Sequence, residues 1–351
     1  FPTRRSSDLI KNEEPGEYFI NGDIEHDKTL INPNIIFKLV NIKQDFLSKV
    51  DIPLKSKNLF SFSLKKYKLK NLKIDSFINF DEVYFSNKYQ NLVFLKEGTI
   101  NSKYENKQLI ADLVSNFAFS DNLKLKNDYK NNSLEITLKS KKNQNIEISG
   151  NIKNEKTLIH SKFLTNILKL DINLLSEGSI NIETDNKFKF EISNNKIVNY
   201  LINSTIELDR LEFNKKIQDI LYLKNIKTKL TLGDKLLNLD LKSNYSFLGE
   251  KNNDINNNII NLKLKRSDPK ISDVEILLQG QNNNINTKKF KKYFNLQDNF
   301  VKDQIINLNS NSLINFSIDD RYNIKKLIIK SNLNFNNLDI SYKSNHIKKY
   351  L

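Results

Sequence analysis

Apolar and polar residues alternate along most of this chain, and the alternation comes in pairs separated by short polar segments. Between positions 133 and 152, apolar side chains recur at every second position on both sides of the polar segment 141–145. Successive side chains of a β-strand point to opposite faces, so this period predicts an amphipathic hairpin with one apolar and one polar face. A chain made of such hairpins is mainly β, and something must cover its apolar face.

Four further segments show the same pattern: 60–74, 178–192, 226–247 and 313–340. The turn of the hairpin in 178–192 is expected at Thr184–Lys187, and that of 226–247 at Gly233–Asp234. We expect the apolar residues of these hairpins to line one continuous apolar surface. The candidate lining residues are Phe60, Phe62, Leu64, Leu134, Ile136, Leu138, Ile180, Ile182, Phe188, Phe190, Leu230, Leu232, Leu239, Leu241, Ile314, Phe316 and Ile318.

A second period, with apolar residues at i, i+3 and i+4, occurs between the hairpins. It is found at 164–168, 197–201, 217–221, 290–294 and 347–351. This spacing places one apolar stripe on a helical turn or two, and pieces this short are stable only when they dock on other structure. A few short helices that plug the ends of the β layer are therefore expected, with segment markers or lids over an internal groove as the alternative.

The beginning of the chain looks foreign to the fold. Residues Phe1–Leu9 resemble the translation of a sequencing adapter, and the chain contains no methionine. We therefore expect residues 1–9 to be an artefact, and residues 10–351 to be a fragment of one continuous repetitive β region. No apolar run reaches the roughly 18 residues that a membrane-spanning helix needs.

The formal net charge of +15 suggests a nucleic-acid partner at first, but the residue types argue against it. Beyond the first nine residues only Arg210, Arg266 and Arg321 are arginines, the usual side chain for gripping phosphates and reading bases. The lysines are spread along the polar faces of the expected strands and do not converge on one patch. The first explanation of the positive charge is an AT-rich coding sequence, which produces heavy use of Lys, Asn, Ile and Phe. Attraction to an anionic lipid surface is the second explanation, and no nucleic acid is expected.

The residues that carry catalysis or metal binding are sparse. The three histidines, His26, His160 and His346, are far apart, and the chain has no cysteine. The glycines are too widely spaced for a phosphate-binding loop or a nucleophile elbow. Asp319–Asp320 stands at a bend between two expected strands, where aspartate favours turns. We therefore expect a protein that is not an enzyme and that has no cofactor, catalytic residue or metal site.

Repeated amphipathic hairpins interrupted by short Ile/Leu/Tyr turns resemble the AsmA-like family of bacterial envelope proteins, of the YhdP and TamB type. The resemblance is carried by residues 313–351, LINFSIDDRYNIKKLIIKSNLNFNNLDISYKSNHIKKYL, and less strongly by residues 19–41, FINGDIEHDKTLINPNIIFKLVN. The resemblance is one of overall hairpin pattern and extends over residues 17–351, without an invariant motif. The low glycine content departs from typical members of the family.

The resemblance implies an elongated, twisted antiparallel β-sheet curled into an open groove. It also implies a role in phospholipid transport between the inner and outer membranes, with phospholipid acyl chains as the bound partner and no protein partner identified. The expected location is the periplasm, with an inner-membrane anchor in a missing N-terminal segment. The alternative is a structural or adhesive β-repeat protein with a closed core. A second sheet about 10 Å from the apolar face would favour that alternative.

Overall fold

In the computed structural model the chain is mainly β, and the residues that the structure describes form sixteen strands of one antiparallel sheet, in which each strand pairs with its neighbours in the sequence. The expectation of a mainly β, antiparallel fold is confirmed. The described residues are 9–14, 16–32, 51–84, 94–118, 129–140, 145–161, 175–176, 178–194, 196–211, 213–214, 221–247, 257–268, 270–294, 302–319, 321 and 323–336. Of the suspected artefact, residues 1–8 lie outside this set, and Leu9 is the first residue of the first strand.

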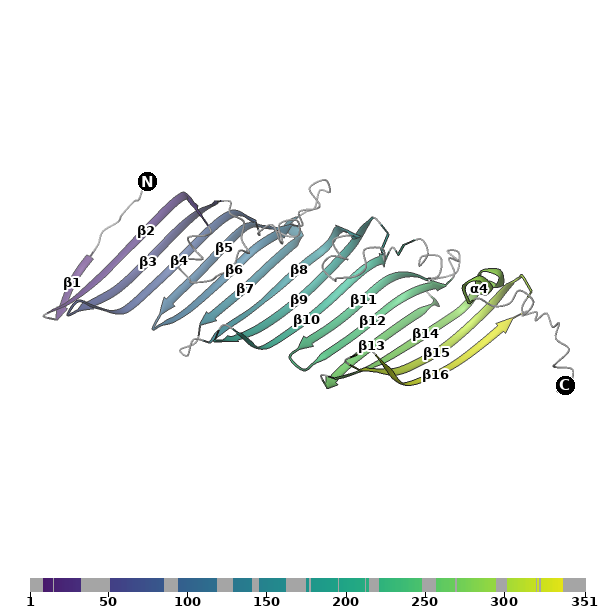
Figure 1. Cartoon of the computed structure of the whole chain (residues 1–351). Helices are drawn as coiled ribbons and strands as arrows, with labels where there is room; N and C mark the ends of the chain where they lie inside the picture. Colours follow the sequence, from purple (N-terminus) through teal and green to yellow (C-terminus); the bar gives the residue numbers. More distant parts are fainter. Residues whose placement is uncertain are drawn as a thin grey trace. The chain divides into compact units, whose positions relative to one another are not determined.

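The chain divides into two compact units, within each of which neighbouring strands lie side by side in a single layer (Figure 1). The first unit comprises 1–159 and 183–203, and the second 160–182 and 204–351. The strands up to the tenth are β1 (Leu9–Glu14), β2 (Glu17–Ile31), β3 (Ile52–Lys65), β4 (Lys68–Tyr84), β5 (Phe94–Glu105), β6 (Gln108–Ala118), β7 (Asn132–Ser140), β8 (Ile146–His160), β9 (Ser179–Ser193) and β10 (Lys196–Leu211). The remaining strands are β11 (Leu221–Gly233), β12 (Leu237–Phe247), β13 (Ile259–Asp268), β14 (Ile271–Asn286), β15 (Ile305–Asp319) and β16 (Ile324–Asn336).

Tight turns connect several of these strands. Lys66 and Tyr67, between β3 and β4, both have positive φ values of 51° and 61°. Two left-handed central residues are the mark of a type I′ turn, whose twist matches that of the flanking strands. The turn between β11 and β12 is at the predicted position, and its Gly233 amide donates to the carbonyl of Leu236 at 2.8 Å. Short polar segments without glycine-rich motifs are thus sufficient to reverse the chain.

One predicted turn is wrong. Thr184–Lys187 lies inside β9, which runs without interruption from Ser179 to Ser193. The polar side chains that suggested a turn instead bond to the preceding strand: Thr184 donates to the side chain of Asn154, and Asn186 donates to the carbonyl of Ile152 at 3.2 Å. Polar residues on a strand face are stable there when the neighbouring strand supplies hydrogen-bond partners.

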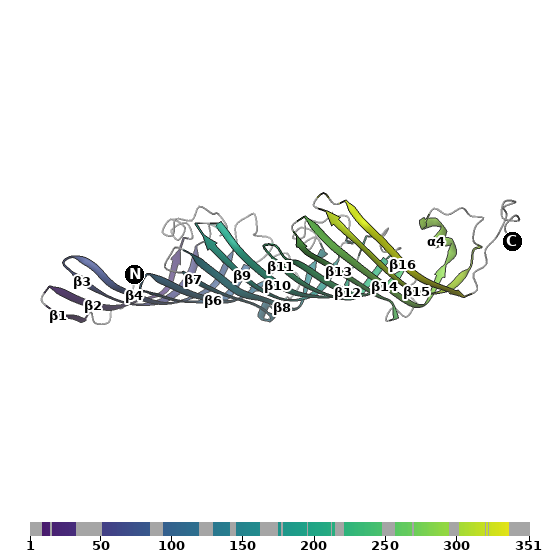
Figure 2. The ribbon, with the colours of Figure 1, turned by 90° about the horizontal axis from the view of Figure 1, so that it is seen from below.

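The helix predictions have mixed outcomes. The segment 290–294 lies in α4 (Thr287–Phe294), which is found at the ends of β14 and β15 (Figure 2). The segment 197–201 is not helical; it belongs to β10, where Ile197 and Val198 are exposed. Leu221 is the first residue of β11, and the segments 164–168, 217–220 and 347–351 lie outside the described residues. A 3₁₀ turn, η2 (Tyr129–Asn131), precedes β7.

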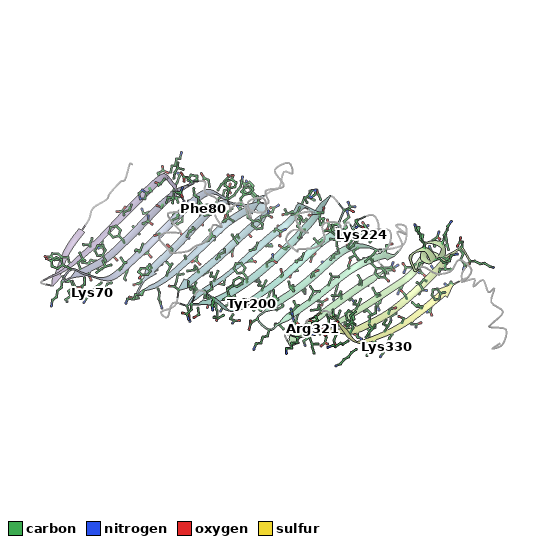
Figure 3. The ribbon with its side chains drawn as sticks, in the orientation of Figure 1. Lys70, Phe80, Tyr200, Lys224, Arg321 and Lys330 are labelled. Carbon is green, nitrogen blue, oxygen red and sulfur yellow. The ribbon has the colours of Figure 1, made fainter. Side chains whose placement is uncertain are left out.

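The hydrophobic core of the first unit is concentrated toward one end of its strands. Its buried members are Ile52, Phe80, Val83, Leu95, Phe117 and Leu134. Figure 3 shows Phe80 near this end of β4 and Lys70 near the opposite end. Along the rest of each strand, apolar side chains are mostly half-buried, because a single layer covers them on one side only.

Each unit also contains a fully buried asparagine. In the first unit, Asn132 donates to the carbonyl of Phe117 at 3.1 Å and accepts from the hydroxyl of Thr157 at 2.8 Å. In the second unit, the side chains of Asn258 and Asn283 bond to each other. Buried amides are stable only when both their donors and acceptors are paired, so these contacts fix the local register.

Candidate functional site

The apolar face of the first unit follows from strand register. Residues that lie directly opposite each other on antiparallel strands point to the same side of the sheet. Leu113 of β6 lies opposite Ile136 of β7, and Ile136 lies opposite Gly150 of β8. The aromatic end of this face is formed on β3, where Phe60 lies opposite Ile74. The predicted lining residues of β3 and β7 therefore lie on the apolar face of this unit.

The second unit has an apolar face of the same kind. Leu239 of β12 lies between Leu230 of β11 and Leu264 of β13. Further along, Phe316 of β15 lies opposite Val274 of β14. Phe188 and Phe190 belong to the first unit and their rings lie 5.6 Å apart, whereas Ile180 and Ile182 belong to the second. The predicted residues are thus distributed over both units.

Most of the seventeen predicted lining residues are half-buried. Two are not: Leu134 is 8% exposed and is part of the core, and Ile180 is 1% exposed. These two residues have little surface left for a ligand and act mainly in packing. The other fifteen, partly covered by neighbours on the same face, present apolar area that another molecule can still cover.

Glycine–phenylalanine pairs across strands are a feature of the apolar face that the sequence analysis missed. Gly22 lies opposite Phe60, and a Cβ on Gly22 would be 2.5 Å from the ring Cζ. A Cβ on Gly150 would be 2.6 Å from Cζ of Phe188, and the ring of Phe80 covers Gly98 in the same way. Each ring places its outer carbons over the bare backbone of the glycine, which shields the glycine and helps to fix the strand register. Isolated glycines within a strand pattern are the sequence signal for such pairs.

The opposite face of each unit is polar and carries cross-strand ion pairs. In the first unit, Glu105 lies 2.6 Å from Lys73 and 3.3 Å from Lys103. The hydrogen bond from Lys73, followed by that from Lys103, lowers the pKa of the Glu105 carboxyl. In the second unit, Lys263 pairs with Glu275 at 3.0 Å. Exposed pairs of this kind add little stability, so their main effect is to keep this face solvated.

The polar face of the first unit nevertheless contains a small apolar island. Leu59, Phe77 and Ile110 are exposed there and surround a shallow hollow with Lys57 and Asp112 at its rim. Because these side chains fall on the polar side of the alternation, the sheet is not perfectly amphipathic.

Asp319 caps the bend between β15 and β16, as the sequence predicted. Its Oδ1 accepts hydrogen bonds from the amides of Arg321 at 3.0 Å and Asn323 at 2.9 Å. The bond from the Asn323 amide, followed by that from the ammonium of Lys325, holds the pKa of this carboxyl well below its ordinary value. The carboxylate is thereby committed to a turn, which is a structural role.

The low pKa of Asp319 predicts a pH-dependent contribution to stability. The folded state favours the charged form, so the contribution is full above the unfolded pKa of about 3.9 and is lost as the pH falls toward the folded value. The substitution Asp319→Asn should lower the thermal midpoint at pH 7, and the difference should shrink progressively below pH 4. Thermal melts from pH 7 to pH 2 measure this difference, with Asp75→Asn on an exposed strand position as control. A difference that stays constant with pH would contradict the assignment.

Among the residues that the structure describes, no group of histidine, aspartate and glutamate side chains could hold a metal ion. Within the same residues, no helix is both long enough and apolar enough to cross a bilayer. No protein-family model, no curated protein and no solved structure matches the chain.

Proposed function

We propose that this protein binds the acyl chains of phospholipids on the apolar faces of its sheet and supports phospholipid transport between the inner and outer membranes of a bacterial envelope. The observation that carries the proposal is the half-buried state of fifteen of the seventeen predicted lining residues. Those on β3 and β7 share one face of the first unit, those on β11, β12 and β15 share one face of the second, and all described strands belong to a single sheet. A protein with a closed core would bury these side chains against a second layer.

The energetics favour movement of the ligand over tight retention. Removing an acyl chain of about 16 carbons from water is worth about 13 kcal/mol at roughly 0.8 kcal/mol per methylene. A bilayer provides a similar gain, so transfer between bilayer and protein is nearly neutral. Selective pockets place a few polar groups among apolar ones. The apolar faces of β7 and β12 instead carry aliphatic side chains at every second residue, with no polar group between them on that face. Such rows suit an acyl chain that slides along the sheet. The net positive charge also suits an anionic headgroup at the membrane surface.

Uptake of a fluorescent phospholipid probe with a 16-carbon chain tests the proposal. The parent protein should take up the probe, and Phe190→Asp or Leu232→Asp should reduce uptake at least tenfold while far-UV circular dichroism stays unchanged. A carboxylate on an apolar surface costs several kcal/mol of desolvation when a ligand covers it. The matched control is Lys139→Asp on the polar face of β7, which should leave uptake unchanged.

Two results would overturn the proposal. The first is a folded parent protein that takes up no probe. The second is unfolding of the aspartate variants, which would mean that the substituted positions belong to a closed core and would favour the structural or adhesive alternative.

A further inference from the structure

The tip of the hairpin formed by β3 and β4 carries an aromatic residue in an unfavourable place. Lys65 lies opposite Lys68, so Lys66 and Tyr67 are the two central residues of the turn. Tyr67 has a φ of 61°, and its side chain is fully exposed to solvent. Left-handed backbone disfavours a bulky side chain and is normally occupied by glycine, asparagine or aspartate. Tyr67 neither packs on the sheet nor suits its backbone, which indicates a role at the surface of the molecule.

The residues around Tyr67 combine positive charge with apolar area. Residues 66–70 read KYKLK, and all five are exposed. Leu69, between Lys68 and Lys70, is 54% exposed. The tip therefore presents three ammonium groups together with one aromatic and one aliphatic side chain.

The charge of the two lysines nearest the turn is not neutralised by the adjacent strands. The carboxylates closest to the tip on β2 and β5 are Glu17 and Glu105. Glu17 lies 3.1 Å from Lys65, and Glu105 is held by two lysines of its own face. Lys66 and Lys68 form no ion pair with any residue that the structure describes.

The next turn at this end of the strands adds a further lysine. In an antiparallel meander every second connection lies at the same end, so the β3–β4 and β5–β6 turns lie on one side of the first unit. The central residues of the β5–β6 turn are Asn106 and Lys107, with φ values of 54° and 61°, and both are exposed. Two left-handed central residues make both turns type I′, which holds Lys66 and Lys107 at fixed positions.

The first residues of β10 lie at the same end and have the same character. β10 begins with Lys196, followed by Ile197 and Val198, which are 59% and 56% exposed. Figure 3 shows Lys70 and Tyr200 at this end of β4 and β10. The lysines are spread along the sequence, but the fold brings a subset of them together at the tight turns of the first unit.

Within the second unit, tight turns repeat the combination of a lysine and an exposed aliphatic residue. Lys235 precedes Leu236 at the β11–β12 turn, and Lys270 precedes Ile271 at the start of β14. Leu236 is 36% exposed and Ile271 is 45% exposed. The buried side chains of β12 and β14, such as Tyr245, lie toward the opposite ends of these strands. Packing therefore does not explain the aliphatic residues at the turns.

An anionic phospholipid bilayer is the partner that this combination fits. Lysines near an anionic bilayer are attracted to its surface, and tyrosine prefers the interface between lipid and water, where its ring is covered and its hydroxyl stays wet. A nucleic acid fits less well, because arginine is the usual side chain for gripping phosphates and residues 10–159 and 183–203 contain none.

We propose that the tight-turn end of the first unit docks on the surface of an anionic phospholipid bilayer. Tyr67 and Leu69 enter the headgroup layer, and Lys66, Lys68 and Lys107 contact lipid phosphates. The type I′ turns hold these side chains in place before binding, which reduces the cost of ordering them. The proposal goes beyond acyl-chain binding and does not require it, because it uses the ends of the strands and not the apolar face.

Flotation of the full chain with vesicles tests the charge requirement. Vesicles of two parts phosphatidylcholine and one part phosphatidylglycerol should bind the protein at least tenfold more tightly than pure phosphatidylcholine, and added salt should weaken the binding. Each lysine at an anionic surface contributes about fivefold, so the double substitution Lys66→Gln and Lys68→Gln should weaken binding at least tenfold. The matched control, Lys130→Gln with Lys156→Gln, removes the same charge from exposed positions at the opposite ends of β7 and β8 and should leave binding unchanged.

The chain contains no tryptophan, so a single tryptophan reports on its own position. The emission of Tyr67→Trp should shift to the blue with the anionic vesicles, whereas that of Tyr84→Trp, at the other end of β4, should not. Tyr67→Asn suits the left-handed backbone, so the thermal midpoint should stay unchanged or rise. The same variant should nevertheless bind the anionic vesicles at least threefold more weakly, which a purely structural role of Tyr67 does not predict.

Several results would overturn the proposal. They are equal binding to the neutral and anionic vesicles, equal losses in the two double-lysine variants, and unshifted emission of Tyr67→Trp. An equal shift on addition of a duplex oligonucleotide would also overturn it, since the site would then take polyanions in general. Uptake of the acyl-chain probe can persist when vesicle docking fails, so this test and that of lipid binding give separate answers.

Discussion

Replacing Gly98 by valine is expected to destabilise the first unit by about 1–3 kcal/mol, the usual cost of overpacking a core. A Cβ at this position would overlap the ring of Phe80. The ring cannot easily move aside, because Phe80 is buried in a cluster with Val83 and Leu95. The cost should appear as a lower midpoint of urea unfolding with an unchanged slope.

Two companion variants make this prediction specific. Gly178→Ala has no atom within 4 Å of the added Cβ and should change stability by less than about 0.5 kcal/mol. Phe80→Ala alone should cost about 3–5 kcal/mol, and in that background Gly98→Val should become nearly neutral because the clash is gone. Additive effects of the two substitutions would show that the ring does not rest on the glycine.

Replacing Asn258 by alanine should destabilise the second unit by about 1–3 kcal/mol, the cost of leaving a buried polar group without its partner. Asn258 is fully buried. Its Oδ1 accepts from Asn283 Nδ2 at 2.8 Å and from the amide of Gln281 at 3.2 Å, and its own amide group donates back to Asn283. The substitution therefore orphans the side chain of Asn283, which is itself buried.

Thermal and urea unfolding of Asn258→Ala measure this cost, and hydrogen exchange should locate the weakening at the Gln281 amide. The matched control is Asn311→Ala, on an exposed position of β15, which should change the midpoint little. Equal effects of the two substitutions would indicate that the loss comes from strand propensity and not from the buried amide pair.

The alternation of apolar and polar residues determined the secondary structure and the faces of the sheet. It predicted the hairpins around β7–β8 and β11–β12, and it placed the lining residues of β3, β7, β12 and β15 on apolar faces. These inferences succeeded because strand pleating is local: a side chain's face depends only on its position along its own strand. The bend at Asp319 could be predicted because it is also local: its hydrogen bonds reach residues two and four positions away.

What only the tertiary structure decided depends on pairing between distant segments. Thr184–Lys187 has the composition of a turn, but hydrogen bonds to β8 hold it in a strand. The segment 197–201 has helical spacing, but pairing within the sheet makes it part of β10, since tertiary context overrides weak local preference. Register likewise decides which glycine lies under a ring and which asparagine is buried. Register is a long-range property of chain pairing, so the sequence pattern predicted most of the strands and their faces, and the fold determined their extent and their partners.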